Sequence, residues 1–91
     1  MAHTEQNSAE LIARVRRIAG QVSAIERGLE RGAPCGEVLH LVAAVRGAVN
    51  GLLDEIIVDH LDQHVAKVGL DEAERLRASE DLKAVIRRYS K

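Results

Sequence analysis

The chain has 91 residues, of which 46% are hydrophobic and 30% are charged, and its formal net charge is -1. The length predicts one small domain, residues 1–91, which buries a smaller fraction of its surface than larger domains do. The near-neutral charge excludes a generally basic protein that coats nucleic acid, and the aliphatic composition, with Tyr89 as the single aromatic residue, predicts an all-α fold.

A polar arm over residues 1–8 precedes a first helix that we predict over residues 9–31. The stretch MAHTEQNSAE is too polar for a signal peptide, and no apolar run reaches the roughly 18 residues of a membrane span, so we expect a cytoplasmic protein without a membrane partner. Apolar residues recur every three or four positions along the helix, which is typical of a coiled-coil seam. They are Leu11, Val15, Ile18, Val22, Ile25 and Leu29. The sequence GAP then ends the helix.

A second helix is predicted over residues 36–66, which makes it ~45 Å long at ~1.5 Å per residue. Its apolar positions are Val38, Leu41, Val42, Val45, Val49, Leu52, Ile56 and Leu61. A compact domain of this size has a radius of gyration near ~12 Å, so the helix would overhang any globule that one chain forms alone. We therefore expect the chain to associate with copies of itself.

A short third helix is predicted over residues 71–89, after a linker near Gly69. Because their connection is short, the first two helices should form an antiparallel hairpin in which positions whose numbers sum to about 67 lie opposite each other. The expected fold is a three-helix chain with a long hairpin and a short third helix.

Two histidines in the stretch HLDQH, His60 and His64, lie four positions apart near the end of the second helix. Positions four apart share a helix face, so both imidazoles can point at one metal ion. The alternative is a solvated pair, since such histidines usually lie on exposed faces. In the hairpin register, the N-terminal arm brings His3 beside His64, so that three imidazoles converge.

The single cysteine, Cys35, cannot form a disulfide within its chain. It cannot join the histidines of its own chain either, because roughly 25 residues of helix, ~38 Å, separate it from His60. In an antiparallel dimer of the long helices, however, Cys35 of the partner subunit arrives beside His60 and His64. We therefore hypothesise a site shared by two subunits and present twice per dimer. The alternative for Cys35 is a small buried side chain that fills space.

Four stretches together resemble the CsoR/RcnR/FrmR family of small helical repressors. They are RVRRIAGQV at residues 14–22, Cys35, AAVRGAVNGL at residues 43–52, and HLDQH. The similarity covers the first two helices almost completely and is looser in the third. It implies an antiparallel dimer that pairs again into a disc-shaped homotetramer without a helix-turn-helix, and a repressor that binds operator DNA. No paired carboxylates, nucleophile motif or phosphate-binding loop stands out, so we do not expect an enzyme.

The resemblance also implies a set of metal ligands. The family's ligand positions map onto His3, Cys35, His60 and His64, with the backbone amine of Ala2 as an added ligand in some members. Copper sensors of the family carry a second cysteine where His64 stands, and copper(I) favours soft thiolates, so copper is disfavoured. An imidazole-rich set with one sulfur suits nickel(II), cobalt(II) or zinc(II). The expected function is a nickel- or cobalt-responsive repressor of a metal-efflux gene, similar to the RcnR/DmeR type.

Two alternative functions stay open, a formaldehyde-responsive repressor and a structural or metal-storage oligomer. Formaldehyde sensors of the family share RVRR and the cysteine, which they link to the amine of an N-terminal proline. Here residue 2 is Ala, and His64 stands where some of those sensors have an acidic residue, so both departures favour a metal signal. A structural or storage oligomer would bind DNA only weakly and without specificity.

A basic flank of the first helix is the candidate DNA-binding surface. At about 100° per residue, Arg14, Arg17 and Gln21 fall within about 60° of one another beside the apolar seam. Repeated four times in a tetramer, these arginines can contact phosphate, while the shape and groove of the DNA supply selectivity. The resemblance implies the same role and extends it to Arg16. The alternative is a solvated arginine run.

Overall fold

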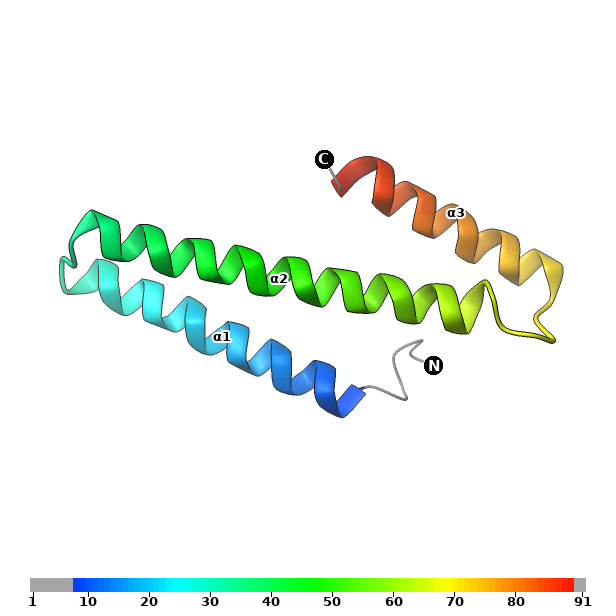
Figure 1. Ribbon diagram of the computed structural model, residues 1–91, viewed down its shortest axis with the longest axis horizontal. Coiled ribbons are helices and arrows are strands. Elements are labelled where there is room, and N and C mark those ends of the chain that lie inside the picture. Colours follow the sequence, from blue (N-terminus) through cyan, green and yellow to red (C-terminus); the bar gives the residue numbers. More distant parts are fainter. Residues whose placement is uncertain (1–7, 90–91) are drawn as a thin grey trace. The chain divides into compact units, whose positions relative to one another are not determined.

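The computed structural model describes residues 8–89, which form three α-helices (Figure 1). Helix α1 spans Ser8–Glu30, α2 spans Cys35–His64 and α3 spans Glu72–Tyr89. The predicted all-α fold with three helices is confirmed, and each helix begins and ends within about two residues of its expected position, the usual uncertainty of a helix boundary. No helix within residues 8–89 is long and apolar enough to cross a membrane.

The described residues fall into two compact units, residues 8–53 and residues 54–89. The first unit is an antiparallel hairpin of α1 and the larger part of α2, and the second contains the end of α2 with α3 (Figure 1). Helix α2 is continuous from Cys35 to His64. The single domain expected from the chain length stays a prediction.

A Schellman motif ends α1 at the turn before α2. Gly32 adopts the left-handed backbone region, with φ at 68°. Its amide donates to the Leu29 carbonyl at 3.2 Å, and the Ala33 amide donates to the Gly28 carbonyl at 2.8 Å. Pro34 then opens α2, because its carbonyl accepts the first amide hydrogen bonds of that helix. The expected stop at the sequence GAP is confirmed.

Within the hairpin, α1 packs on α2 through one edge of its apolar seam. Leu11 is buried, with 8% of its surface exposed, and Ile18 and Ile25 are half-buried one heptad apart. Five half-buried apolar positions of α2 follow the same three-four spacing: Val38, Leu41, Val45, Ala48 and Leu52. Gly28 lies where the helices meet, since a Cβ atom there would be 3.6 Å from Leu41 Cδ1. This contact confirms the expected antiparallel register.

The other edge of the seam on α1 does not face α2. Val15, Val22 and Leu29, also one heptad apart, remain 49%, 49% and 64% exposed. Helix α2 has a matching exposed row in Leu39, Val42 and Val49, which are 65%, 47% and 44% exposed. The six-residue seam on α1 is therefore two rows, of which the hairpin covers one.

In the second unit, α3 folds back beside the end of α2 (Figure 1). The Asp71 side chain caps α3, because its Oδ1 accepts the Ala73 amide at 3.2 Å. Ala78 is buried at 7% exposed, and Leu82 and Val85 on the same side of α3 are half-buried. The backbone of this helix therefore comes close to α2, and the Ala78 carbonyl contacts the side chain of His60.

Candidate functional site

The last two turns of α2 bring the side chains of His60 and His64 together. Their ring centroids are 5.3 Å apart with an angle of 38° between the ring planes, and both residues are half-buried. Two imidazoles at this spacing can turn toward a common ion. Because the two histidines of HLDQH are four residues apart on a helix, their imidazole rings lie side by side as a pair of nitrogen donors.

A backbone carbonyl of α3 fixes the tautomer of His60. The ring Nε2 lies 2.9 Å from the Ala78 carbonyl oxygen. Because a carbonyl only accepts hydrogen bonds, Nε2 is the nitrogen that carries the proton, and in a neutral ring the lone pair is then on Nδ1. Histidines that bind metals are commonly oriented in this way by a carbonyl on the ring nitrogen that does not bind the metal. Nδ1 is thus the nitrogen through which a neutral His60 could bind a metal ion.

Cys35 is the first residue of α2, and its side chain is exposed. It belongs to the hairpin unit, whereas His60 and His64 belong to the unit that contains α3. Within residues 8–89, no three His, Cys, Asp or Glu side chains lie close enough together to hold a metal ion. The other predicted ligands, His3 and the amine of Ala2, fall outside the described residues. This part of the chain supplies two converging imidazoles and, elsewhere, an exposed thiol.

The chemistry of these donors selects among metals. Nitrogen donors with one sulfur suit borderline divalent ions such as nickel(II), cobalt(II) and zinc(II), whereas magnesium and calcium prefer oxygen ligands. The residues present therefore fit a divalent transition metal once a further donor joins the pair.

The predicted basic flank of α1 divides into exposed and half-buried side chains. Arg16 and Arg17 are exposed and lie on solvated faces of α1. Arg14 is half-buried and lies across α2, where its Nη2 would be only 2.7 Å from a Cβ atom on Gly51. Gln21 is also half-buried, and its buried Oε1 has no hydrogen-bond partner among the described residues. Within the predicted basic flank, Arg16 and Arg17 are thus the arginines that face solvent in a single chain.

Two groups near the histidine pair, the Ala78 carbonyl and Arg75, were not predicted from the sequence. The Ala78 carbonyl is a backbone acceptor, and nothing in an alanine side chain marks it. Arg75 lies in the weakly patterned third helix, where alternating arginines and carboxylates look like an ordinary solvated face. Their roles become visible only in the structure, where α3 packs beside the end of α2 and both groups form hydrogen bonds there.

Comparison with known proteins identifies a matching family and several relatives. A family described as "Metal-sensitive transcriptional repressor" matches residues 7–88. A protein of Serratia marcescens described as "Uncharacterized protein in bioA 5'region" is 45% identical over the full length of both chains. "Transcriptional repressor RcnR" of Salmonella arizonae is 42% identical over 96% of this chain and 92% of its own.

A solved structure supports the same relationship. The formaldehyde-responsive regulator FrmR of Salmonella enterica serovar Typhimurium, in a variant with histidine in place of a glutamate, has a TM-score of 0.88 and 39% identity. The alignment covers 97% of this chain and 99% of that structure. With a family match over nearly the whole length and relatives above 40% identity, the chain belongs to the family of metal-sensitive transcriptional repressors.

Proposed function

We propose that this chain is a cytoplasmic, nickel(II)- or cobalt(II)-responsive repressor that holds operator DNA in its metal-free form and releases it when metal binds. The regulated gene would encode a metal exporter, and no catalytic step is involved. The observation that carries this proposal is the convergence of His60 and His64, with His60 oriented by the Ala78 carbonyl. The similarity to proteins named RcnR agrees with the proposal.

The exposed row on α2 supplies the surface for a second copy of the chain. Cys35, Leu39, Val42 and Val49 are exposed and recur at steps of four, three and seven residues. Continued at the same three-four spacing, the row passes through Arg46, Leu53, Ile56 and His60. Two such helices can pack antiparallel so that each position of this longer row lies opposite another of its positions. The register that sets Cys35 against the partner subunit's His60 also sets Val42 against the partner subunit's Leu53. One arrangement therefore covers Leu39 and Val42 with apolar residues and brings Cys35 to the imidazoles, and two dimers would form the homotetramer.

In the proposed site, Cys35 of one subunit supplies the thiolate, and His60 Nδ1 and His64 of the other supply imidazole nitrogens. His3 of the N-terminal arm, with the amine of Ala2, would complete the set. The metal, when bound, supplies a divalent charge that holds thiolate and imidazoles in one coordination sphere. Zinc(II) is a further candidate for the same donors.

Release of DNA would follow because the ligands come from two subunits and from the arm that precedes α1. Ligation favours the subunit arrangement in which these donors meet. The α1 arginines Arg14, Arg16 and Arg17, with Gln21, would form the operator surface, and the favoured arrangement presents them less well to DNA phosphates. Metal and operator must then weaken each other's binding by the same factor, typically equivalent to ~1 to 3 kcal/mol.

Cobalt(II) titration of the reduced, full-length protein tests the proposal. Thiolate-to-cobalt charge-transfer absorption reports ligation by Cys35, and fluorescence anisotropy of labelled upstream DNA reports operator release in the same sample. We expect both signals to change together. Cys35→Ala should abolish the charge-transfer band, and His64→Ala should weaken cobalt binding.

His40→Ala is the matched control, because His40 is an exposed histidine of the same helix, outside the proposed site. It should bind cobalt(II) and release DNA like the wild type. Operator that stays bound while cobalt saturates the protein would contradict the proposed signal. A missing charge-transfer band with intact cobalt binding would remove Cys35 from the site.

A formaldehyde-responsive repressor is the second candidate, because Cys35 is exposed and the chain is similar to FrmR. The formaldehyde carbon would form one bond to the Cys35 sulfur and one to the N-terminal amine, and the carbonyl oxygen would leave as water. Mass spectrometry after exposure would detect this methylene bridge. A bridge that forms and releases operator, in a protein that ignores nickel and cobalt, would favour this candidate over the metal signal.

A further inference from the structure

The end of α2 that carries the histidine pair is fastened to α3 at two places. His60 is hydrogen-bonded through Nε2 to the Ala78 carbonyl at 2.9 Å. Arg75, one turn before Ala78 on α3, donates from Nη1 to the Val65 carbonyl at 2.8 Å. Val65 directly follows His64, the last residue of α2. One contact is therefore made by the first histidine of the pair, and the other lies directly after the second.

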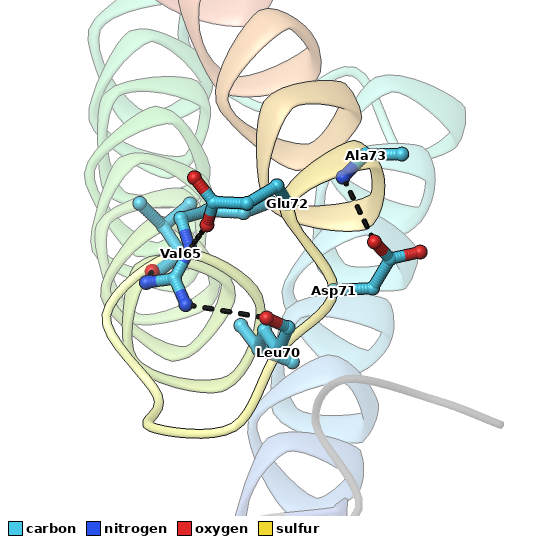
Figure 2. Close-up of polar contacts among 6 residues, drawn as sticks. Val65, Leu70, Asp71, Glu72 and Ala73 are labelled. Carbon is cyan, nitrogen blue, oxygen red and sulfur yellow. Dashed lines mark hydrogen bonds and ion pairs between the residues drawn. The ribbon is translucent and has the colours of Figure 1, made fainter.

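The Arg75 guanidinium also closes the linker between the two helices. Its Nη2 donates to the Leu70 carbonyl at 3.5 Å, and its buried Nε lies 3.2 Å from Glu72 Oε1 as a charge contact (Figure 2). Carbonyls at the C-terminal end of a helix lack amide donors from the helix itself, and a cation there is favoured by the helix dipole. Only about a third of the Arg75 side chain is exposed. The group is thus held in place by carbonyls from both ends of the linker.

We propose that Arg75 is a positioning residue for the histidine pair, acting on His64 through the Val65 carbonyl. This inference rests on the proposed metal-binding role of His60 and His64. A terminal helical turn frays readily, and His64 lies in the last turn of α2, so the direction of its ring depends in part on how firmly the backbone after it is held. Arg75 provides that restraint. The chain supplies no side-chain donor to the Val65 carbonyl other than Arg75 within residues 8–89.

Arg75→Ala and Arg77→Ala form a matched pair for the test. Arg77 is an exposed arginine of α3 with no hydrogen bond or ion pair in the described part of the chain, so both variants remove the same charge from the same helix. We expect Arg75→Ala to weaken cobalt(II) binding roughly tenfold to a hundredfold, the usual effect of removing a group that orients a ligand, and Arg77→Ala to leave it unchanged.

A double-mutant cycle shows whether Arg75 acts through His64. If it does, Arg75→Ala should cause no further loss of cobalt affinity in a His64→Ala background, because the oriented ligand is already absent. Equal losses in both backgrounds would overturn the inference, as would equal effects of Arg75→Ala and Arg77→Ala. Arg75→Lys keeps the charge but places its donors on a single nitrogen, which cannot span both carbonyls, so it should recover part of the affinity.

Amide hydrogen exchange of the metal-free protein separates this inference from the proposed function. The Val65 and Ala66 amides donate to the Leu61 carbonyl at 3.1 and 2.8 Å, and these bonds report order in the last turn of α2. Both amides should exchange faster in Arg75→Ala than in Arg77→Ala. Unchanged exchange would overturn the inference even if cobalt binds. A wild type that binds no cobalt would refute the proposed function, and the exchange result would still decide whether Arg75 orders this turn.

Discussion

Replacing Gly51 with alanine should weaken operator binding without destabilising the fold. The new Cβ atom would lie 2.7 Å from Arg14 Nη2, which is too close, so the end of this flexible side chain must shift from its present position on α2. Alanine is ~1 kcal/mol better than glycine in a helix interior, and displacing a half-buried arginine from its contacts costs about 0.5–1.5 kcal/mol. The two terms nearly cancel, so the free energy of unfolding should change by less than ~1 kcal/mol.

Operator binding should weaken in Gly51→Ala because the Arg14 side chain is no longer held in one conformation. Fixing a free arginine side chain costs up to ~2 kcal/mol of conformational entropy, and 1.4 kcal/mol is a tenfold change in affinity, so we expect operator affinity to fall roughly tenfold. Fluorescence anisotropy at constant salt measures the affinity, and urea denaturation measures the stability. The loss should not exceed that of Arg14→Ala.

Gly47→Ala is the control for this prediction. Gly47 lies one turn earlier on α2, and a Cβ atom there would meet nothing within 4 Å in the chain. This variant should gain ~1 kcal/mol of stability from helix propensity and bind operator as the wild type does. Full operator affinity in Gly51→Ala, together with a loss in Arg14→Ala, would contradict a role for Gly51 in ordering Arg14. If neither variant affects binding, Arg14 is not part of the operator surface.

Three further changes test the assembly, the core and one surface pair. Leu39→Glu places a charge in the exposed row of α2, so sedimentation should show loss of the oligomer while the helix content by circular dichroism persists; an intact tetramer would contradict the proposed interface. Leu11→Ala should lower the free energy of unfolding by about 2–5 kcal/mol in urea, since Leu11 is buried at 8% exposed. A loss below 1 kcal/mol would show that this end of the hairpin contributes little. The hydrogen bond and charge of Lys83, whose Nζ lies 2.9 Å from Glu80 Oε2, lower the pKa of the Glu80 carboxyl. Lys83→Met should therefore raise that pKa in an NMR titration. The stabilisation from this pair is present above the unfolded-state pKa of Glu80 and is lost as the pH falls through its lowered folded-state value.

Apolar periodicity and local boundary signals together predicted the three helices. Gly32 supplies the left-handed residue that ends α1, and Asp71 supplies the side chain that caps α3. Periodicity did not divide the seam on α1 into its two rows. Leu11 and Val15 satisfy the same pattern, yet one is buried by α2 and the other is 49% exposed. An apolar stripe indicates that a helix face is buried against another surface. Its width alone does not show whether that surface belongs to the same chain.

The candidate site was predictable where it depends on spacing along one helix. The convergence of His60 and His64 follows directly from four-residue spacing. The direction of Arg14 was not predictable, because it depends on the absence of a side chain at Gly51 on the opposite helix. The restraint by Arg75 depends on carbonyls of the linker, and a backbone acceptor has no sequence signature.

The exposed rows and the incomplete ligand set lead to one thermodynamic consequence. Val22 on α1 and Leu39 on α2 remain exposed in the hairpin, and among residues 8–89 only two imidazoles converge at the end of α2. In the proposed dimer, the contact that covers Leu39 also brings Cys35 to the imidazoles, so association and ligation are linked equilibria. Metal must then strengthen the dimer by the same factor by which dimerisation strengthens metal binding. Cobalt(II) affinity should therefore fall when the protein is diluted below its dimer dissociation constant, and Leu39→Glu should weaken cobalt binding although no ligand has changed. Equal cobalt affinity in dilute and concentrated wild-type protein, across a range in which sedimentation shows dissociation, would contradict a site shared by two subunits.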